Sequence, residues 1–239
     1  MIGLDLNLTY VKEYLESHSS KSVRESLIRM GVQEEYVLGV PTNEIRKFAK
    51  RIGVNDKLAY ELWQSGIHEY RLLATLLFSK SHPKEDIYDI MNDVNNWALC
   101  DHICKSFILD LDYVKEVIFE WHNCEKLYFK RAAFVLISAI VSIREEYLDG
   151  HDIDDYLMFI YNEAFDDRIY VKKAVSWALR EIGKINKDNQ LRAIDLANQL
   201  IRERKGVWVG KHALKELNSL IKVEARSRLL SKYSKMANQ

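Results

Sequence analysis

The chain has 239 residues, of which 48% are hydrophobic and 29% are charged, so it can bury a sizeable core and is not a disordered protein. Its 35 basic and 35 acidic residues give a formal net charge of zero. No uncharged apolar run approaches the roughly 20 residues that cross a bilayer, and the N-terminal residues lack the basic start and apolar middle of a signal peptide. The sequence therefore predicts a cytoplasmic protein without a membrane partner.

The charge is distributed unevenly along the chain. Residues 168–239 contain 17 Lys and Arg but 6 Asp and Glu, whereas the preceding 167 residues contain 18 basic and 29 acidic residues. The C-terminal third thus has a surplus of 11 positive charges, which favours an anionic partner that meets one side of the molecule. Solvated helix faces that happen to be rich in lysine are the alternative explanation.

Three cysteines, an odd number in a long chain, argue against a disulfide framework and for a reducing compartment. A zinc site built from Cys100, Cys104, His122 and Cys124 is an alternative. Structural zinc sites usually place paired ligands on turns, however, whereas Cys100 and Cys104 fall inside a predicted helix. We therefore predict no metal and no cofactor.

Helical periodicity of the hydrophobic residues runs through the whole chain, which contains 2 prolines and 9 glycines. Helix start signals occur at Thr42, at Pro83, and at Asn95 or Asn96. The predicted helices cover residues 7–18, 20–30, 42–52, 56–64, 68–80, 84–94, 96–109, 112–122, 126–143, 152–164, 168–184, 188–203, 208–219 and 221–235.

The helix predicted over 96–109 places a tryptophan and an aspartate away from its own hydrophobic face. At about 100° per residue, the apolar arc contains Leu99, Cys100, Ile103 and Phe107. Trp97 and Asp101 fall on the opposite arc, together with Lys105. Core packing does not explain this pair, so Trp97 and Asp101 are candidate site residues.

The helix predicted over 126–143 is apolar nearly all round, because Arg131 is followed by 12 uncharged residues. Such a helix is expected to lie centrally in the fold. A guanidinium at its end either pairs with a buried carboxylate, for which Asp101 is a candidate, or reaches out to an anion.

The helix predicted over 168–184 combines basic and aromatic residues on one arc. Its core arc contains Val171, Val175, Ala178 and Ile182, and its far arc contains Lys173, Trp177, Arg180 and Lys184. Such a stripe suits a surface that binds phosphates with cations and packs a flat ring against a sugar or base. Packing of Trp177 under a neighbouring helix is the alternative.

These helices also repeat one another. LYFKRAAFVLISAI (127–140) aligns with IYVKKAVSWALREI (169–182), which pairs Arg131 with Lys173 at a separation of 42 residues. VWVGKHALKELNSL (207–220) is a weaker third copy with Lys211 as its basic residue, and EYRLLATLLFSK (69–80) resembles the same helix upstream. A period near 42 with two helices per unit is typical of HEAT and armadillo repeats.

Repeats of this kind stack side by side, because a single repeat cannot bury its apolar face alone. We therefore predict one all-helical domain over residues 1–239, an all-α HEAT-like superhelix (α-solenoid) with a basic concave groove. Function is expected on the concave surface.

Four motifs in order resemble the DNA alkylation repair family typified by the AlkD glycosylases, which are HEAT-like helical arrays. The motifs are LGVPTNEIRKFAK (38–50), NNWALCD (95–101), YFKRAAFVL (128–136) and VKKAVSWALRE (171–181). The sequence departs from the family's pattern at Pro41, Asn43, Ala98 and Cys100. The resemblance covers most of the chain.

The resemblance implies site residues and an activity. Asp101 would be the catalytic carboxylate, Trp97 and Trp177 the aromatic walls around the deoxyribose, and Arg131 a phosphate contact. With the basic stripe and the third repeat copy, the expected DNA-binding residues are Arg131, Lys173, Arg180, Lys184 and Lys211. The expected enzyme is a monomeric DNA glycosylase that acts on double-stranded DNA with alkylated bases, without metal or cofactor and without a base-specific pocket.

The implied chemistry requires a single carboxylate. A purine alkylated at N3 or N7 already carries positive charge, so it departs without being protonated by a general acid. What remains is to stabilise an oxocarbenium-like sugar, as in glycoside cleavage. A carboxylate about 4 Å from that charge contributes roughly 4 kcal/mol at an effective dielectric of about 20, or on the order of a thousandfold in rate.

Two other functions remain open from the sequence. A non-catalytic relative would use the same basic surface to bind branched or distorted DNA. A HEAT-type scaffold would instead bind an acidic protein or peptide, since helical arrays commonly serve that purpose.

Overall fold

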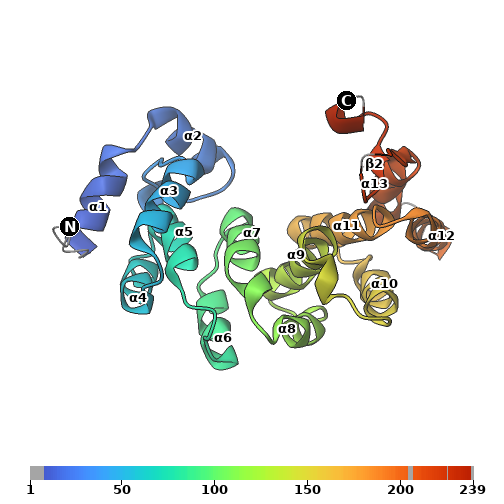
Figure 1. Ribbon diagram of the computed structural model, residues 1–239, viewed down its shortest axis with the longest axis horizontal. Helices are drawn as coiled ribbons and strands as arrows, with labels where there is room; N and C mark the ends of the chain where they lie inside the picture. Colours follow the sequence, from blue (N-terminus) through green and yellow to red (C-terminus); the bar gives the residue numbers. More distant parts are fainter. Residues whose placement is uncertain (1–7, 204–206, 225, 238–239) are drawn as a thin grey trace. The chain divides into compact units, whose positions relative to one another are not determined.

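The computed structural model describes residues 8–203, 207–224 and 226–237. Within these ranges the chain forms 13 α-helices, four short 3-10 helices and one two-stranded sheet, which confirms the predicted all-α fold (Figure 1). The chain divides into two compact units, Met1–Asp112 (unit 1) and Tyr113–Gln239 (unit 2). None of the described helices has the length and apolar character needed to cross a membrane.

Unit 1 is organised around the helix α5, which packs against α3, α4 and α7. Eight of its ten residues are buried, because it meets neighbours on several sides. The elements of unit 1 are α1 (Leu8–Ser17), α2 (Lys21–Arg29), η1 (Glu34–Tyr36), α3 (Thr42–Ile52), α4 (Asp56–Gln64), α5 (His68–Leu77), α6 (Lys84–Asn92), α7 (Trp97–Ser106) and η2 (Ile108–Asp110).

A buried carboxylate fixes the loop that precedes α3. Glu69 of α5 is fully buried and accepts backbone N–H bonds from Leu38, Gly39 and Val40 at 3.0, 2.6 and 3.2 Å. Gly39 has a φ of +92°, and a Cβ there would lie 2.5 Å from the backbone oxygen of Ser20. Only glycine fits at position 39. The residues Leu38–Val40, at the start of the first motif, thus have a structural role as the loop that Glu69 holds.

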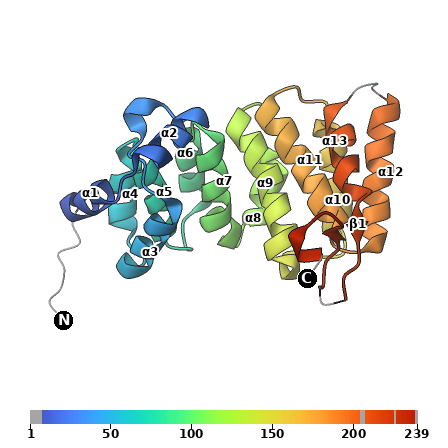
Figure 2. The same ribbon diagram turned by 90° about the horizontal axis from the view of Figure 1, so that it is seen from above.

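Unit 2 is organised around α11, which packs against α9, α10, α12 and α13 (Figure 2). The elements of unit 2 are α8 (Val114–Trp121), α9 (Leu127–Ile143), η3 (Glu145–Tyr147), α10 (Asp152–Glu163), α11 (Ile169–Gly183), α12 (Lys187–Glu203), α13 (Trp208–Leu217), β1 (Leu220–Ile221), β2 (Leu230–Ser231) and η4 (Lys235–Ala237).

The three repeated segments of the sequence are the helices α9, α11 and α13. Each is the second helix of a contacting pair, α8 with α9, α10 with α11, and α12 with α13. The helix α11 contacts both α9 and α13, so equivalent residues of the repeat lie on adjacent helices. All residues of α9 from Phe129 to Val141 are buried, which confirms the prediction of a central helix.

The predicted helix over residues 221–235 is wrong. Two short antiparallel strands form there instead, with Leu220 opposite Ser231 and Ile221 opposite Leu230. The backbone N–H of Leu229 donates to Lys184 O at 2.8 Å, at the C-terminal end of α11. Tertiary contacts to the unpaired carbonyls of that helix end therefore prevail over the local helical periodicity.

Candidate functional site

The helix α11 presents the predicted basic and aromatic stripe. The residues of its core arc, Val171, Val175, Ala178 and Ile182, are all fully buried. On the far arc Lys173 is exposed, and Trp177, Arg180 and Lys184 are half-buried. The amphipathic pattern therefore orients the helix as expected, and the stripe stays out of the core of unit 2.

A cavity of about 290 Å³ opens beside this stripe within unit 2. It is lined by Arg131 of α9, by Lys173, Trp177 and Arg180 of α11, and by Trp208 and His212 of α13. Arg131 and Lys173 are the pair that the 42-residue repeat aligns, so stacking of the repeats brings both cations to one cavity. Lys211, the third predicted member of this series, is exposed on α13 and does not line the cavity.

Two adjacent cations of α9 have different surroundings. The ammonium group of Lys130 is buried and pairs with Glu163 at 2.6 Å and with Asp166 at 3.4 Å. Arg131 is 5% exposed, donates from Nη1 to Tyr170 O at 2.6 Å, and lines the cavity. Lys130 is therefore neutralised inside unit 2, whereas the guanidinium of Arg131 forms part of the cavity wall.

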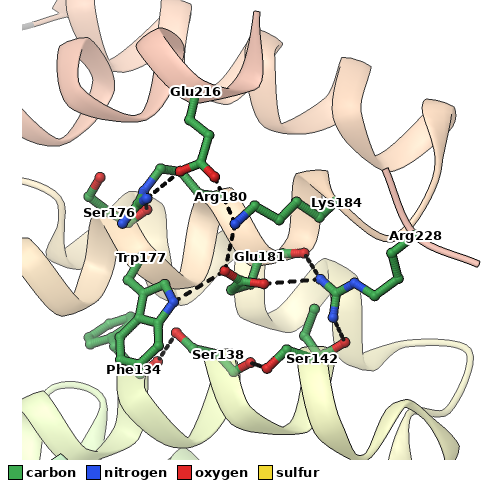
Figure 3. A network of polar contacts seen from close by, with 11 residues as sticks. Phe134, Ser138, Ser142, Ser176, Trp177, Arg180, Glu181, Lys184, Glu216 and Arg228 are labelled. Carbon is green, nitrogen blue, oxygen red and sulfur yellow. Dashed lines mark hydrogen bonds and ion pairs between the residues drawn. The ribbon is translucent and has the colours of Figure 1, made fainter. Parts of the chain in front are cut away.

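The C-terminal part of the stripe is engaged by carboxylates, as Figure 3 shows. Lys184 Nζ lies 2.8 Å from both Glu181 Oε1 and Glu216 Oε1, and Arg180 Nη1 pairs with Glu216 Oε2. Glu181 Oε1 also accepts a hydrogen bond of 3.2 Å from Trp177 Nε1. The cations Arg180 and Lys184 thus have acidic partners within the same unit.

Arg228 completes this network from the C-terminal segment. Its Nη2 donates to Glu181 O at 2.8 Å and to Glu181 Oε2 at 3.2 Å, and its Nη1 donates to Val141 O at 2.6 Å (Figure 3). Burial by itself raises the pKa of the Glu216 carboxyl, but hydrogen bonds from Lys184 and Arg180 outweigh it and leave the pKa below its usual value. Glu216 is therefore an anion at neutral pH.

Sequence reasoning missed four residues of this region, Glu181, Trp208, His212 and Glu216. Glu181 lies one helical turn after Trp177, and the other three lie in the third repeat copy. Trp208, His212 and Glu216 follow one another at four-residue intervals, so they share one face of a predicted helix, and this spacing was the available signal.

Trp208 and His212 form a stacked pair on α13. Their ring centroids are 4.2 Å apart with an interplanar angle of 14°, and Ser176 Oγ lies 2.9 Å from His212 Nδ1. Burial lowers the pKa of His212, and the nearby positive charge of Arg180 lowers it further. The imidazole is therefore neutral at pH 7, and the two rings form an uncharged aromatic surface in a basic cavity.

In unit 1, α7 carries the other predicted site residues. Asn96 caps the helix by accepting the Leu99 N–H at 2.9 Å, which confirms the predicted start signal. The arc predicted as core, Leu99, Cys100, Ile103 and Phe107, is fully buried. Trp97 and Asp101 are half-buried, and Trp97 Nε1 donates to Met30 O at 3.1 Å.

The next residue of α7, His102, contacts two hydroxyl groups. Its Nδ1 lies 2.9 Å from Thr75 Oγ1 and 3.1 Å from Ser106 Oγ. Burial lowers the pKa of His102 to about 4, with smaller contributions from the charges of Arg46, His68 and Lys105. His102 is therefore a neutral ring behind the Trp97–Asp101 face.

The cysteines considered for zinc binding belong to different units. Cys100 and Cys104 are buried in α7, whereas Cys124 follows α8 in unit 2. Within residues 8–203, 207–224 and 226–237, no three His, Cys, Asp or Glu side chains form a group suited to a metal ion.

Comparisons with known proteins agree with this architecture. The sequence profile of the family described as "DNA alkylation repair enzyme" matches residues 11–217. A solved structure has a TM-score of 0.78 and 18% identity to the chain, covering 96% of this chain and 99% of its own. It is described as belonging to "a new family of proteins related to the HEAT-like repeat DNA glycosylases with affinity for branched DNA structures". This likeness shows that the chain has the HEAT-like repeat fold. A comparison of the chain with curated proteins found no significant match.

Proposed function

Because the chain belongs to the DNA alkylation repair enzyme family, we propose that it is a DNA glycosylase that releases cationic N3- or N7-alkylated purines from duplex DNA. The observation that carries this proposal is the position of Asp101. It shares with Trp97 the arc of α7 that faces away from the buried core, and it remains half-buried rather than fully solvated. A carboxylate in such surroundings interacts with a developing positive charge more strongly than in water.

Asp101 is assigned the stabilisation of the oxocarbenium-like sugar and the positioning of the attacking water. Such a carboxylate is worth roughly 4 kcal/mol at about 4 Å, or on the order of a thousandfold in rate. Trp97 adds a cation–π attraction of about 0.5 to 2 kcal/mol to the same charged state. Its hydrogen bond to Met30 O fixes the indole before substrate binds, so little side-chain entropy is lost on binding.

The cavity of unit 2 is assigned the contact with the DNA backbone. Arg131 and Lys173 supply positive charge for phosphates, and Trp177 supplies a flat apolar surface for a sugar. Trp177 Nε1 is already bonded to Glu181, so the indole is held by the protein and contacts a ligand through its carbon atoms.

A base-release assay tests the proposed activity. Duplex DNA methylated at random is incubated with the purified protein, and the released purines are separated and quantified. We expect release of N3- and N7-methylated purines, and a decrease on the order of a thousandfold in single-turnover rate for Asp101→Asn. The affinity of this variant for the DNA should stay within about threefold of wild type, because the substitution removes the charge and keeps the shape.

A matched control is Asp89→Asn, which removes an exposed carboxylate from α6 in the same unit. It should excise at the wild-type rate. Full activity of Asp101→Asn would remove Asp101 from its assigned role.

A second function is favoured by the solved structure that the chain resembles. That protein is described as having affinity for branched DNA, and the basic cavity of unit 2 would suit such a ligand equally well. The same assay separates the two functions. Tight binding to branched DNA without release of any alkylated purine would identify the chain as a DNA-binding relative.

A further inference from the structure

The cavity of unit 2 contains an aromatic surface that phosphate binding does not require. Trp208 and His212 stack nearly in parallel, at 4.2 Å and 14°, and both line the cavity. Cations alone are sufficient to hold a phosphodiester. A pair of flat rings in the same cavity points to a ligand that is itself partly flat and aromatic.

The protein holds this stacked pair in a fixed position. The helix α13 approaches α12 closely at Gly210, where an added Cβ would lie 2.6 Å from Ala197 O. His212 is fixed in addition by Ser176, whose hydroxyl lies 2.9 Å from its Nδ1. A surface built in advance loses little conformational entropy when a ligand stacks on it.

The charges around the pair select an anionic ligand. Arg131, Lys173 and Arg180 line the cavity, and no carboxylate is among its lining residues in the described part of the chain. Glu216 engages Arg180, whereas Lys173 is exposed beside the cavity and Arg131 forms part of its wall. A flat ring next to anionic groups is the chemistry of a nucleotide within a strand.

We propose that the Trp208–His212 pair is a stacking platform for an unpaired nucleobase of a DNA strand whose phosphates are bound by Arg131 and Lys173. This inference rests on the proposed DNA binding by the same cavity and does not require the glycosylase activity. The cavity volume of about 290 Å³ lies at the lower end of small-molecule sites, which suits one base rather than a larger group.

Stacking on the platform does not select a particular base. His212 Nδ1 is engaged by Ser176, so this ring offers its face rather than that nitrogen to a ligand. Stacking tolerates every base, because each has an aromatic face. An acidic or phosphorylated peptide would use the cations but would leave the two rings without a stacking partner, so the cavity favours a nucleic acid.

The binding experiment uses three versions of one duplex with the full-length protein. The first is fully paired, the second has a single unpaired adenine, and the third has an abasic spacer at the same bulge. We expect the unpaired adenine to be bound about tenfold more tightly than the abasic bulge, because only the base stacks on the platform. Equal affinity for these two DNAs would overturn the proposal.

Variants test whether the preference for the unpaired adenine depends on the Trp208–His212 platform. Trp208→Ala should reduce the tenfold preference to less than about twofold, and Trp208→Phe should retain at least half of it, because a phenyl ring still stacks. Arg131→Ala should weaken binding to all three DNAs alike. Persistence of the preference in a folded Trp208→Ala protein would contradict the proposal, and the wild-type comparison remains decisive if this variant does not fold.

A free nucleotide offers the same flat base and anionic phosphate as a DNA strand. Deoxyadenosine 5′-monophosphate should displace the bulged DNA only far above the Kd of that DNA, since it lacks the neighbouring phosphates. Displacement near that Kd would assign the cavity to a free nucleotide and overturn the proposal. Base release from methylated DNA is measured separately on the same variants, so loss of the platform and loss of the glycosylase are distinguishable.

Discussion

The helices α7 and α11 each place a tryptophan outside their apolar arc, but the polar groups around them differ. In α7, Trp97 Nε1 donates to the backbone oxygen of Met30, and the neighbouring His102 contacts hydroxyl groups. In α11, Trp177 Nε1 donates to the carboxylate of Glu181, which also binds cations. The indole of α7 is thus held by a backbone oxygen, whereas that of α11 is held by a carboxylate that belongs to an ion-pair network.

This difference has a physical consequence for each unit. The half-buried, neutral His102 makes unit 1 sensitive to acid, because its protonation places a charge where few water molecules reach it. The stability of the α11 region depends on its ion pairs, because carboxylates there each bind several cations. The same carboxylates restrict which of these cations can bind DNA. Four measurements test this contrast, in order of decreasing expected effect.

His102 should contribute strongly to the acid sensitivity of unit 1. The pKa of His102 is about 4 in the folded protein and 6.5 in the reference state, so between these values the unfolded chain binds a proton that the folded chain does not. Stability therefore falls as the pH is lowered through this window, by about 3 kcal/mol at pH 4. Urea unfolding at a series of pH values should show a loss of stability toward pH 4 that is smaller by this amount in His102→Asn; the buried His68, whose pKa is also lowered by burial, accounts for the remainder.

Ser106→Ala is the control for this measurement, since it removes a hydroxyl that contacts His102 without removing a titrating group. It should keep the wild-type pH dependence. A His102→Asn protein with the same loss of stability toward pH 4 would contradict the prediction.

The ionic character of the α11 region is tested by Glu181→Gln. This change removes the charge that Lys184 and Arg228 share at 2.8 and 3.2 Å. We expect a loss of about 2 kcal/mol in the free energy of unfolding at pH 7, because two partly buried cations each lose one of their anionic or polar partners. The exposed Glu224→Gln control should change it by less than about 0.5 kcal/mol; equal effects of the two changes would refute the role of the network.

DNA binding should depend strongly on Arg131. Arg131→Ala should raise the Kd for duplex DNA about tenfold and lower the slope of log K against log salt by about 0.9, as expected for one lost phosphate contact. Fluorescence anisotropy at several salt concentrations measures both. An unchanged slope would indicate that Arg131 has a structural role only.

The smallest effect is expected for Lys184, which the sequence alone groups with the DNA-binding residues. Its charge is already engaged by Glu181 and Glu216. Lys184→Gln should therefore change the Kd by less than about twofold, whereas Lys173→Gln, at an exposed position on the same stripe, should raise it about threefold. A larger effect at Lys184 than at Lys173 would show that DNA displaces the carboxylates.

Most of the helical architecture could be predicted from the sequence because helix formation and amphipathic orientation are local properties. The residues that face the core on α7 and α11 follow from the 3.6-residue period, and Asn96 caps its helix through its own side chain. The repeat also indicated that Arg131 and Lys173 occupy equivalent places, and both line one cavity. The roles of Asp101, Trp97 and Trp177 in base excision remain predictions.

Only the tertiary structure decided which charges are neutralised and how the chain ends. Glu216 reaches Arg180 from a helix 36 residues away, and Lys130 meets its acid 33 residues away, so no local pattern reveals either pair. The segment after α13 has helical periodicity, yet contacts from Arg228 and Leu229 to the end of α11 hold it as strands. The physical reason is the same in each case: an ion pair or a helix end is satisfied by whichever group packing brings near, and the hydrophobic period along one helix contains no information about that group.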